Sequence, residues 1–167
     1  AESYTNFVRS TAERLNIATS ALSRITTRYS DGPTKMSYNA LYLQQTKQLD
    51  AHWVLNDGIR FNLVQLDARF ADTTLMHFPF NKAIQNNTAI TGNLGVAYNG
   101  ENGYRATAGL SSGFRSPNVD DLTKVFDTKT GYVVVPNKDL KPEYTYNAEI
   151  NISHTGNIAS WGASVFY

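Results

Sequence analysis

Several residue types that mark common protein classes are scarce or absent in this chain of 167 residues. There is no cysteine, which excludes disulfides, zinc–thiolate sites and thiol catalysis. Charged residues make up 17% of the chain, the net charge is +1, and the basic residues do not cluster. A nucleic-acid partner, which would need a basic surface, is therefore not expected. No apolar run approaches the roughly 18 residues of a membrane-spanning helix.

What the chain does contain is alternation of apolar and polar residues. Barrel strands need only ~9–11 residues to cross a membrane, with every second residue apolar. Ten tyrosines and eight phenylalanines suit such a sheet. We therefore expect strands over residues 37–49, 53–67, 88–98, 104–113, 144–153 and 158–167. Residues 7–9 are expected to end a further strand, and residues 12–22 have the pattern of a short helix.

The alternation separates two faces on each expected strand. In the clearest segment one face carries Tyr144, Tyr146, Ala148, Ile150 and Ile152, and the other carries Thr145, Asn147, Glu149, Asn151 and Ser153. On residues 53–67 the apolar face is interrupted by Asp57. We expect Tyr144, Tyr146, Ile150 and Ile152 to face lipid, and Asn147, Glu149 and Asn151 to face a polar lumen.

Short and long connections alternate along the chain. Short turns are expected around Asp50, Gly100 and Gly156, and long connections over residues 68–87 and 114–141. An up-and-down transmembrane β-barrel has this asymmetry, with its long loops at one end. Two alternatives remain open: a soluble β-sandwich that binds a glycan or a partner protein, and a small complete porin-like barrel. In a piece of a larger barrel, the segment around Ser37 and the strand ending at Tyr167 would be open edges.

The segment from Gly113 to Glu143 is too long for an ordinary hairpin turn. It holds three of the five prolines, and each of them interrupts regular strand pairing. A long loop without helical periodicity is usually functional or disordered, and its apolar residues 133–135 and 140 favour an ordered, functional loop.

Two motifs in this segment carry a family resemblance. Phe114-Arg115-Ser116-Pro117 resembles the Phe-Arg-Ala-Pro box of TonB-dependent outer-membrane receptors, with serine in place of the usual alanine. Residues 136–143, Pro-Asn-Lys-Asp-Leu-Lys-Pro-Glu, resemble the Asn-Pro-Asp-Leu-Lys-Pro-Glu box that follows it in that family. The two boxes stand in the right order and the second opens onto a strand. The resemblance extends over about residues 28–167 and is best over 112–149.

The resemblance implies an all-β, antiparallel, up-and-down barrel segment in the bacterial outer membrane. Residues 1–167 would be part of one barrel domain, supplying about six strands of a barrel of ~22, with the plug domain outside them. The implied function is active import of a scarce nutrient, such as a ferric siderophore or other chelate, and not catalysis. The implied partners are TonB (through the plug), the remaining strands and plug of the same receptor, a small chelate or nutrient ligand, and outer-membrane lipid.

Candidate site residues follow from the motifs and from the expected outer loops. The motif residues are Phe114, Arg115, Ser116, Pro117, Asn118, Pro136, Asn137, Asp139, Leu140, Pro142 and Glu143. Aromatic and arginine side chains in the loops suit a small chelated ligand; these are Arg28, Arg69, Phe78, Phe80 and Tyr132. The alternative is that Phe78, Phe80 and residues 133–135 pack the loops onto one another.

No residue pattern in the sequence indicates a catalytic site, a metal site or a cofactor. His52, His77 and His154 match no ligand spacing. Asp120, Asp121 and Asp127 do not have the spacing of a calcium loop, and a solvated loop or a cap for a short helix over 121–126 is favoured instead. The polar faces carry Arg60, Arg105, Asn147 and Glu149, which could contact a plug. Haem receptors of the family typically carry a histidine between the two boxes, and none stands between Pro117 and Pro136.

Overall fold

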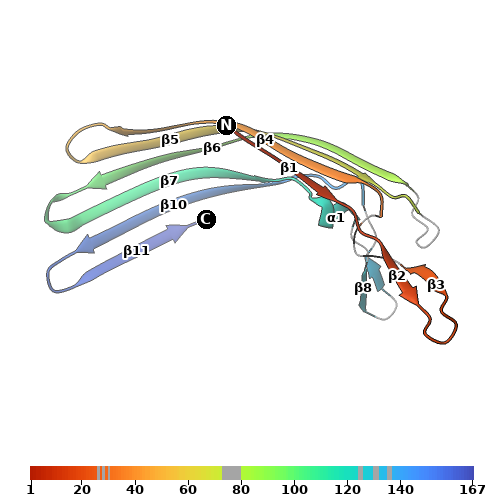
Figure 1. The fold of residues 1–167 in the computed structure, drawn as a ribbon. Helices are drawn as coiled ribbons and strands as arrows, with labels where there is room; N and C mark the ends of the chain where they lie inside the picture. The colour runs from red at the N-terminus through yellow and green to blue at the C-terminus, as the bar shows by residue number, and fades with distance from the viewer. Residues whose placement is uncertain are drawn as a thin grey trace.

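The computed structural model describes residues 1–25, 27, 29, 31–72, 80–123, 126–129, 132–134 and 137–167. It forms one curved, antiparallel, seven-stranded sheet in the order β1-β4-β5-β6-β7-β10-β11 (Figure 1). Its strands are β1 (Glu2–Val8), β4 (Thr34–Gln48), β5 (Trp53–Arg69), β6 (Lys82–Asn99), β7 (Tyr104–Arg115), β10 (Glu143–Thr155) and β11 (Ser160–Phe166). The remaining elements are β2 (Ala12–Leu15), β3 (Leu22–Ile25), η1 (Glu101–Gly103), α1 (Val119–Thr123), β8 (Phe126–Lys129) and β9 (Tyr132–Val134).

All six expected strands are confirmed, and so is the further strand expected to end within residues 7–9, which is β1, the seventh strand of the sheet. The helical pattern of residues 12–22 does not produce a helix, because β2 and β3 form a hairpin there, paired from Ala12↔Ile25 to Leu15↔Leu22. The side chain of Asn16 explains the turn: its Oδ1 accepts the backbone N–H groups of Ala18 and Thr19 at 3.0 and 3.3 Å. An asparagine that satisfies the backbone in this way favours a turn over a continuing helix.

The connection expected over residues 68–87 is much shorter in the structure. β5 continues to Arg69 and β6 begins at Lys82, with continuous pairing from Arg69↔Lys82 to Leu63↔Thr88. The polar run Gln85-Asn86-Asn87 reads as a loop in the sequence, yet it is strand. α1 has five residues, and no helix in the described part of the chain has the length and apolar character to cross a membrane.

The sheet is open, with β1 and β11 at its two edges (Figure 1). The edge expected around Ser37 is wrong, because β4 pairs with β1 there (Thr5↔Ser37). The edge on the other side, at the strand leading to Tyr167, is confirmed. Within the described residues, the sheet therefore neither closes into a small barrel nor packs against a second sheet.

The two faces of the sheet differ sharply in polarity. One face presents the cross-strand row Leu55, Val96, Ala108, Ile150, Val165. Two members of this row are exposed, Ile150 (60%) and Val165 (75%), and so are Leu94 (53%) and Leu110 (59%) on the same face. The opposite face presents the row Gln44, Gly58, Asn93, Ser111, Asn147. Helix α1 lies on the concave side (Figure 1) and packs on the second of these faces, so the apolar face is convex and the polar face concave.

The alternation changes phase towards the long-loop end of the sheet. On β5 the convex residues up to Leu63 are apolar except for Asp57, but the next three are Gln65, Asp67 and Arg69. Beyond Leu63 the apolar residues are instead Val64, Leu66 and Ala68, which are concave and buried. β4 switches in the same way, from Leu41 and Leu43 on the convex face to Met36 on the concave face. We call this end of the sheet, residues 34–40, 64–69 and 82–88, the collar.

The short turns are confirmed and lie together at the end opposite the collar (Figure 1). Aromatic rings gather on the convex face beside them: Trp53 with Tyr98 (centroids 4.9 Å apart) and Tyr104 with His154 (4.4 Å). Such a belt is typical of a membrane–water interface. In the first turn, Asp50 accepts the backbone N–H groups of His52 and Trp53, both at 2.8 Å, and these bonds lower the pKa of Asp50.

The second turn depends on a glycine. Gly103 has φ +79°, and a Cβ there would lie 2.1 Å from the carbonyl oxygen of Thr155 on β10. We expect Gly103→Ala to destabilise the sheet by at least about 1–3 kcal/mol, since both strain and a clash with backbone result. Gly95→Ala is the matched control, because its Cβ would meet nothing closer than 3.7 Å. Equal unfolding midpoints in detergent for the two variants would contradict this account.

Candidate functional site

The collar has its own hydrophobic core on the concave face. Met36, Val64, Leu66, Ala68 and Ala83 line it from the sheet, and Val119 and Leu122 of α1 fill it. Leu122 and Ala83 are completely buried, and Leu66 is 2% exposed. Phe80 and Leu140 pack against this core from the neighbouring connections. The phase change of the strands therefore creates the surface on which the loop between β7 and β10 docks.

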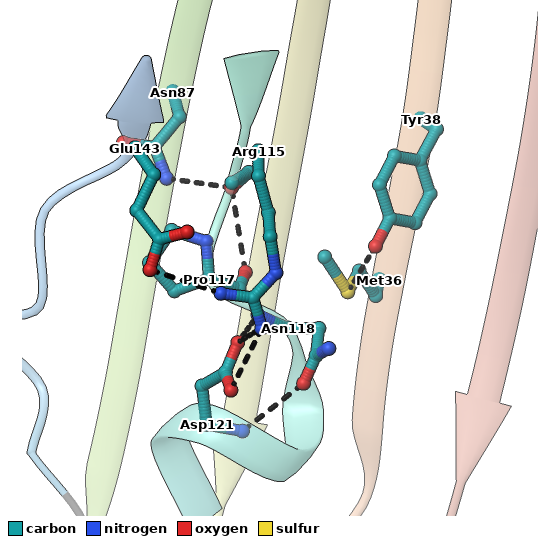
Figure 2. Close-up of polar contacts among 9 residues, drawn as sticks. Met36, Tyr38, Asn87, Arg115, Pro117, Asn118, Asp121 and Glu143 are labelled. Carbon is teal, nitrogen blue, oxygen red and sulfur yellow. Dashed lines mark hydrogen bonds and ion pairs between the residues drawn. The ribbon is translucent and has the colours of Figure 1, made fainter. Parts of the chain in front are cut away.

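Arg115 ties this loop to the sheet. It is the last residue of β7, and its cross-strand partner is Glu143, the first residue of β10. Figure 2 shows its guanidinium between two carboxylates: Nη1 donates to Glu143 Oε1 at 3.1 Å, and Nη2 to Asp121 Oδ1 and Oδ2 at 3.1 and 2.8 Å. The arginine side chain is 53% exposed, so solvent screens both pairs and each pair is weak on its own.

Asp121 also closes the start of α1. Asn118 Oδ1 accepts the N–H of Asp121 at 3.0 Å, and Asp121 Oδ2 accepts the N–H of Asn118 at 3.0 Å (Figure 2). This reciprocal pair has the geometry of a capping box, which satisfies backbone donors at the helix start. The expected cap for a short helix is therefore present, but the helix begins at Val119 and not at residue 121.

A second set of bonds joins both motifs to β6. Asn87 Nδ2 donates to the hydroxyl of Ser116, which is 8% exposed, at 2.9 Å (Figure 2). Gln85 Nε2 donates to the backbone carbonyls of Leu140 and Lys138 at 2.8 and 3.2 Å. Asn137 Oδ1 accepts the N–H of Asp139 at 2.9 Å, which holds the turn of the second motif. We call Gln85, Asn87, Arg115, Ser116, Asn118, Asp121 and Glu143 the clamp.

The structure thus brings the two motifs to one place, beside strands that the sequence did not connect with them. Phe114 contacts Tyr144 across the β7–β10 pair (centroids 5.4 Å apart), and Pro117 accepts a hydrogen bond from Ser116 at 3.3 Å. Pro136 lies outside the described residues. Gln85 and Asn87 are not among the site residues predicted from the sequence, because they fall in the expected connection over residues 68–87. The available signal was the alternation of Ala83, Gln85 and Asn87, which places them on the same face of a strand.

The residues expected to bind ligand do not form one cluster among the described residues. Arg69 ends β5 with a convex side chain, and it donates to both carboxylate oxygens of Asp67 at 3.2 and 3.1 Å. Phe80 packs edge-on to Phe70, with centroids 5.9 Å apart, and against the collar core. Arg28 and Phe78 lie outside the described residues, as does the side chain of Tyr132. His77 is likewise not described.

The concave face below the collar is polar and partly interconnected. Arg60 Nη2 donates to Glu2 Oε2 at 2.6 Å and Nε to Asn62 Oδ1 at 2.7 Å, while its guanidinium lies 5.6 Å from the ring centre of Tyr42. Asn62 Nδ2 donates onward to Thr91 Oγ1 at 3.3 Å. Arg105, Asn147 and Glu149 are concave as well. Among the described residues, no three histidine, aspartate or glutamate side chains are grouped to hold a metal ion.

Comparison with known proteins agrees with this architecture. The family model described as "TonB dependent receptor-like, beta-barrel" matches residues 2–167. None of the curated proteins matches the chain. The family match, the antiparallel sheet with its apolar convex and polar concave faces, and the two motifs lead to the same conclusion. The chain belongs to the TonB-dependent receptor-like β-barrel family of bacterial outer-membrane proteins.

Proposed function

We propose that this chain is part of the barrel wall of a receptor that actively imports a scarce nutrient, such as a ferric siderophore or another chelate. At the level of the family, it is an outer-membrane receptor and transporter. The observation that carries the finer proposal is the open, curved sheet with an apolar outer face, a polar inner face and its long connections at one end. Residues 1–167 would be one part of a single barrel domain.

The open edges support further strands of the same receptor as partners. Among the described strands, β1 and β11 each pair on one side only, and unpaired backbone N–H and C=O groups cost several kcal/mol each in hydrocarbon. Additional strands would satisfy these groups and close the barrel around a lumen lined by Arg60, Asn93 and Asn147. A plug inside that lumen, and TonB acting through the plug, complete the proposed mechanism: loops capture the ligand, and energy from the inner membrane displaces the plug.

The proposed ligand is a ferric chelate and not haem. No histidine stands between Pro117 and Pro136, where a haem receptor would present an iron ligand. Arginine and aromatic side chains of the long-loop end, Arg28, Arg69, Phe78, Phe80 and Tyr132, are the proposed contacts, since they suit a planar or anionic chelate. Of these, Arg69 pairs with Asp67, and its own side chain is 55% exposed, which leaves donors available.

The experiment uses the full-length receptor in detergent. It is titrated with ferric hydroxamate and ferric catecholate siderophores and with haem, and growth of a deletion strain on each as sole iron source is compared with and without TonB. We expect tight binding and TonB-dependent growth for a ferric siderophore. Tight haem binding with a histidine-ligated Soret band, lost in His77→Ala, would overturn the ligand proposal. Growth on a chelate that does not need TonB would overturn the proposed mechanism.

A further inference from the structure

The clamp residues act on the position of a loop, and none of them is among the proposed ligand contacts. We propose that Arg115, with Asn87 and Gln85, is a positioning residue: it holds α1 and both motifs against the concave face as a fixed wall of the outer mouth. This inference rests on the proposed function only in calling that end of the sheet the outer mouth.

Burial provides the first argument that the wall is fixed. Leu122 is 0% exposed and Val119 8%, so lifting α1 off the sheet would expose both of these side chains and the core beneath them. A loop that opens readily has few buried apolar contacts and low local stability. α1 has the opposite character, because its two apolar residues lie in the same core as Met36, Leu66 and Ala83.

The polar contacts provide the second argument, because they connect three separate strands. Arg115 links β7 with β10 through Glu143 and with α1 through Asp121. Asn87 and Gln85 on β6 hold the first motif at Ser116 and the second at the carbonyls of Lys138 and Leu140. Moving either motif away from the sheet would break bonds to β6 and leave Ser116, which is 8% exposed, without its partner from Asn87. The two motifs therefore form one unit with the collar.

The two carboxylates that bind Arg115 differ in what they hold, and this difference can be tested. Asp121 receives two bonds from Arg115 and also closes the capping box, whereas Glu143 receives one bond and stays on its own strand. Loss of the bond to Asp121 should free α1, and loss of the bond to Glu143 should not. Preorganised loops bind more tightly because less ordering is left to occur on binding.

The test measures whether a cysteine at position 122 becomes accessible. Leu122→Cys is made in the full-length receptor. Residues 1–167 contain no other cysteine, and any cysteine elsewhere in the receptor is changed to serine so that only position 122 can react. Intact cells are treated with a membrane-impermeant maleimide, and the labelling rate reports how often α1 leaves the sheet. Lys138→Cys, at an exposed position, is the fast-reacting reference. The barrel unfolding temperature is measured for every variant.

We expect slow labelling of Leu122→Cys that does not change when the inner membrane is de-energised. Adding Arg115→Ala or Asp121→Asn should accelerate it about two- to fivefold, which is the range that the loss of a solvent-screened ion pair allows, while the barrel unfolding temperature stays unchanged. Adding Glu143→Gln should accelerate it less than twofold. Asp121→Asn keeps the test decisive if Arg115→Ala does not reach the outer membrane.

Two results would overturn the proposal. Labelling that rises in energised cells would show a moving lid, and equal rates with and without Arg115 would show that the arginine positions nothing. Neither readout uses ligand or uptake, so a failed siderophore titration would refute the proposed function and leave this inference standing.

Discussion

Ile150→Arg is expected to lower the free energy of unfolding of the membrane-inserted receptor by about 2–4 kcal/mol, with the full loss if the residue lies near the bilayer midplane. Ile150 is 60% exposed on the convex face, between Ala108 and Val165 in the neighbouring strands. In a closed barrel this face meets hydrocarbon, where a guanidinium loses its hydration. Urea titration of the full-length receptor in lipid vesicles, followed by tryptophan fluorescence, measures the loss.

Asn151→Arg is the matched control, one residue along the same strand. Asn151 is concave and donates from Nδ2 to Thr107 Oγ1 at 3.0 Å, so the change removes one hydrogen bond on the polar side. We expect a loss of about 1 kcal/mol or less. Equal losses at positions 150 and 151 would count against membrane insertion of this face, whatever the family of the chain.

Leu66→Ala is expected to cost about 2–5 kcal/mol, which is the other large effect. Leu66 is 2% exposed in the collar core, beside Leu122 of α1, and its removal leaves a cavity that a β-strand cannot close by shifting alone. Besides lowering the stability, the cavity weakens the surface on which α1 docks. Thermal unfolding in detergent measures the first effect, and proteolysis within residues 119–142 measures the second.

Leu41→Ala provides the comparison for this prediction. Leu41 is 66% exposed on the convex face of the adjacent strand β4, where lipid or detergent fills the space that the smaller side chain leaves. We expect it to cost about 1 kcal/mol or less, since no cavity forms. If Leu41→Ala lowered the stability as much as Leu66→Ala, the packing of the collar core would not be the cause of the loss at Leu66.

The phase change connects these predictions. A strand of 17 residues, such as β5, is longer than the ~9–11 residues that cross a bilayer. The excess at the collar end has reversed polarity, apolar towards the interior and polar outside, which is the pattern of a water-exposed sheet that covers a core. The sequence shows this reversal at Leu63 and Val64. The expected strand over residues 53–67 already includes this point, but an expectation built on one continuous phase of alternation does not detect the change of face.

Which side chains share a face of the sheet can be read from the sequence alone. Successive side chains of a strand point to opposite sides whatever the strand pairs with, so the separation of Ile150 from Asn151 needs no knowledge of the neighbours. The short turns at Asp50, Gly100 and Gly156 were equally readable, because turn residues act locally. The two motifs were recognisable as sequence, and with them the family.

Where the motifs dock, and which residues hold them, depends on the packing of distant segments. The bond from Asn87 to Ser116 joins residues 29 apart, that from Arg115 to Glu143 residues 28 apart, and that from Arg60 to Glu2 residues 58 apart. No local pattern specifies such partners, because their meeting depends on strand register and on closing long loops. For the same reason the sequence placed the open edge of the sheet around Ser37, whereas it lies at β1. Its seven residues gain their backbone partners only when residues 34–40 of β4 lie beside them.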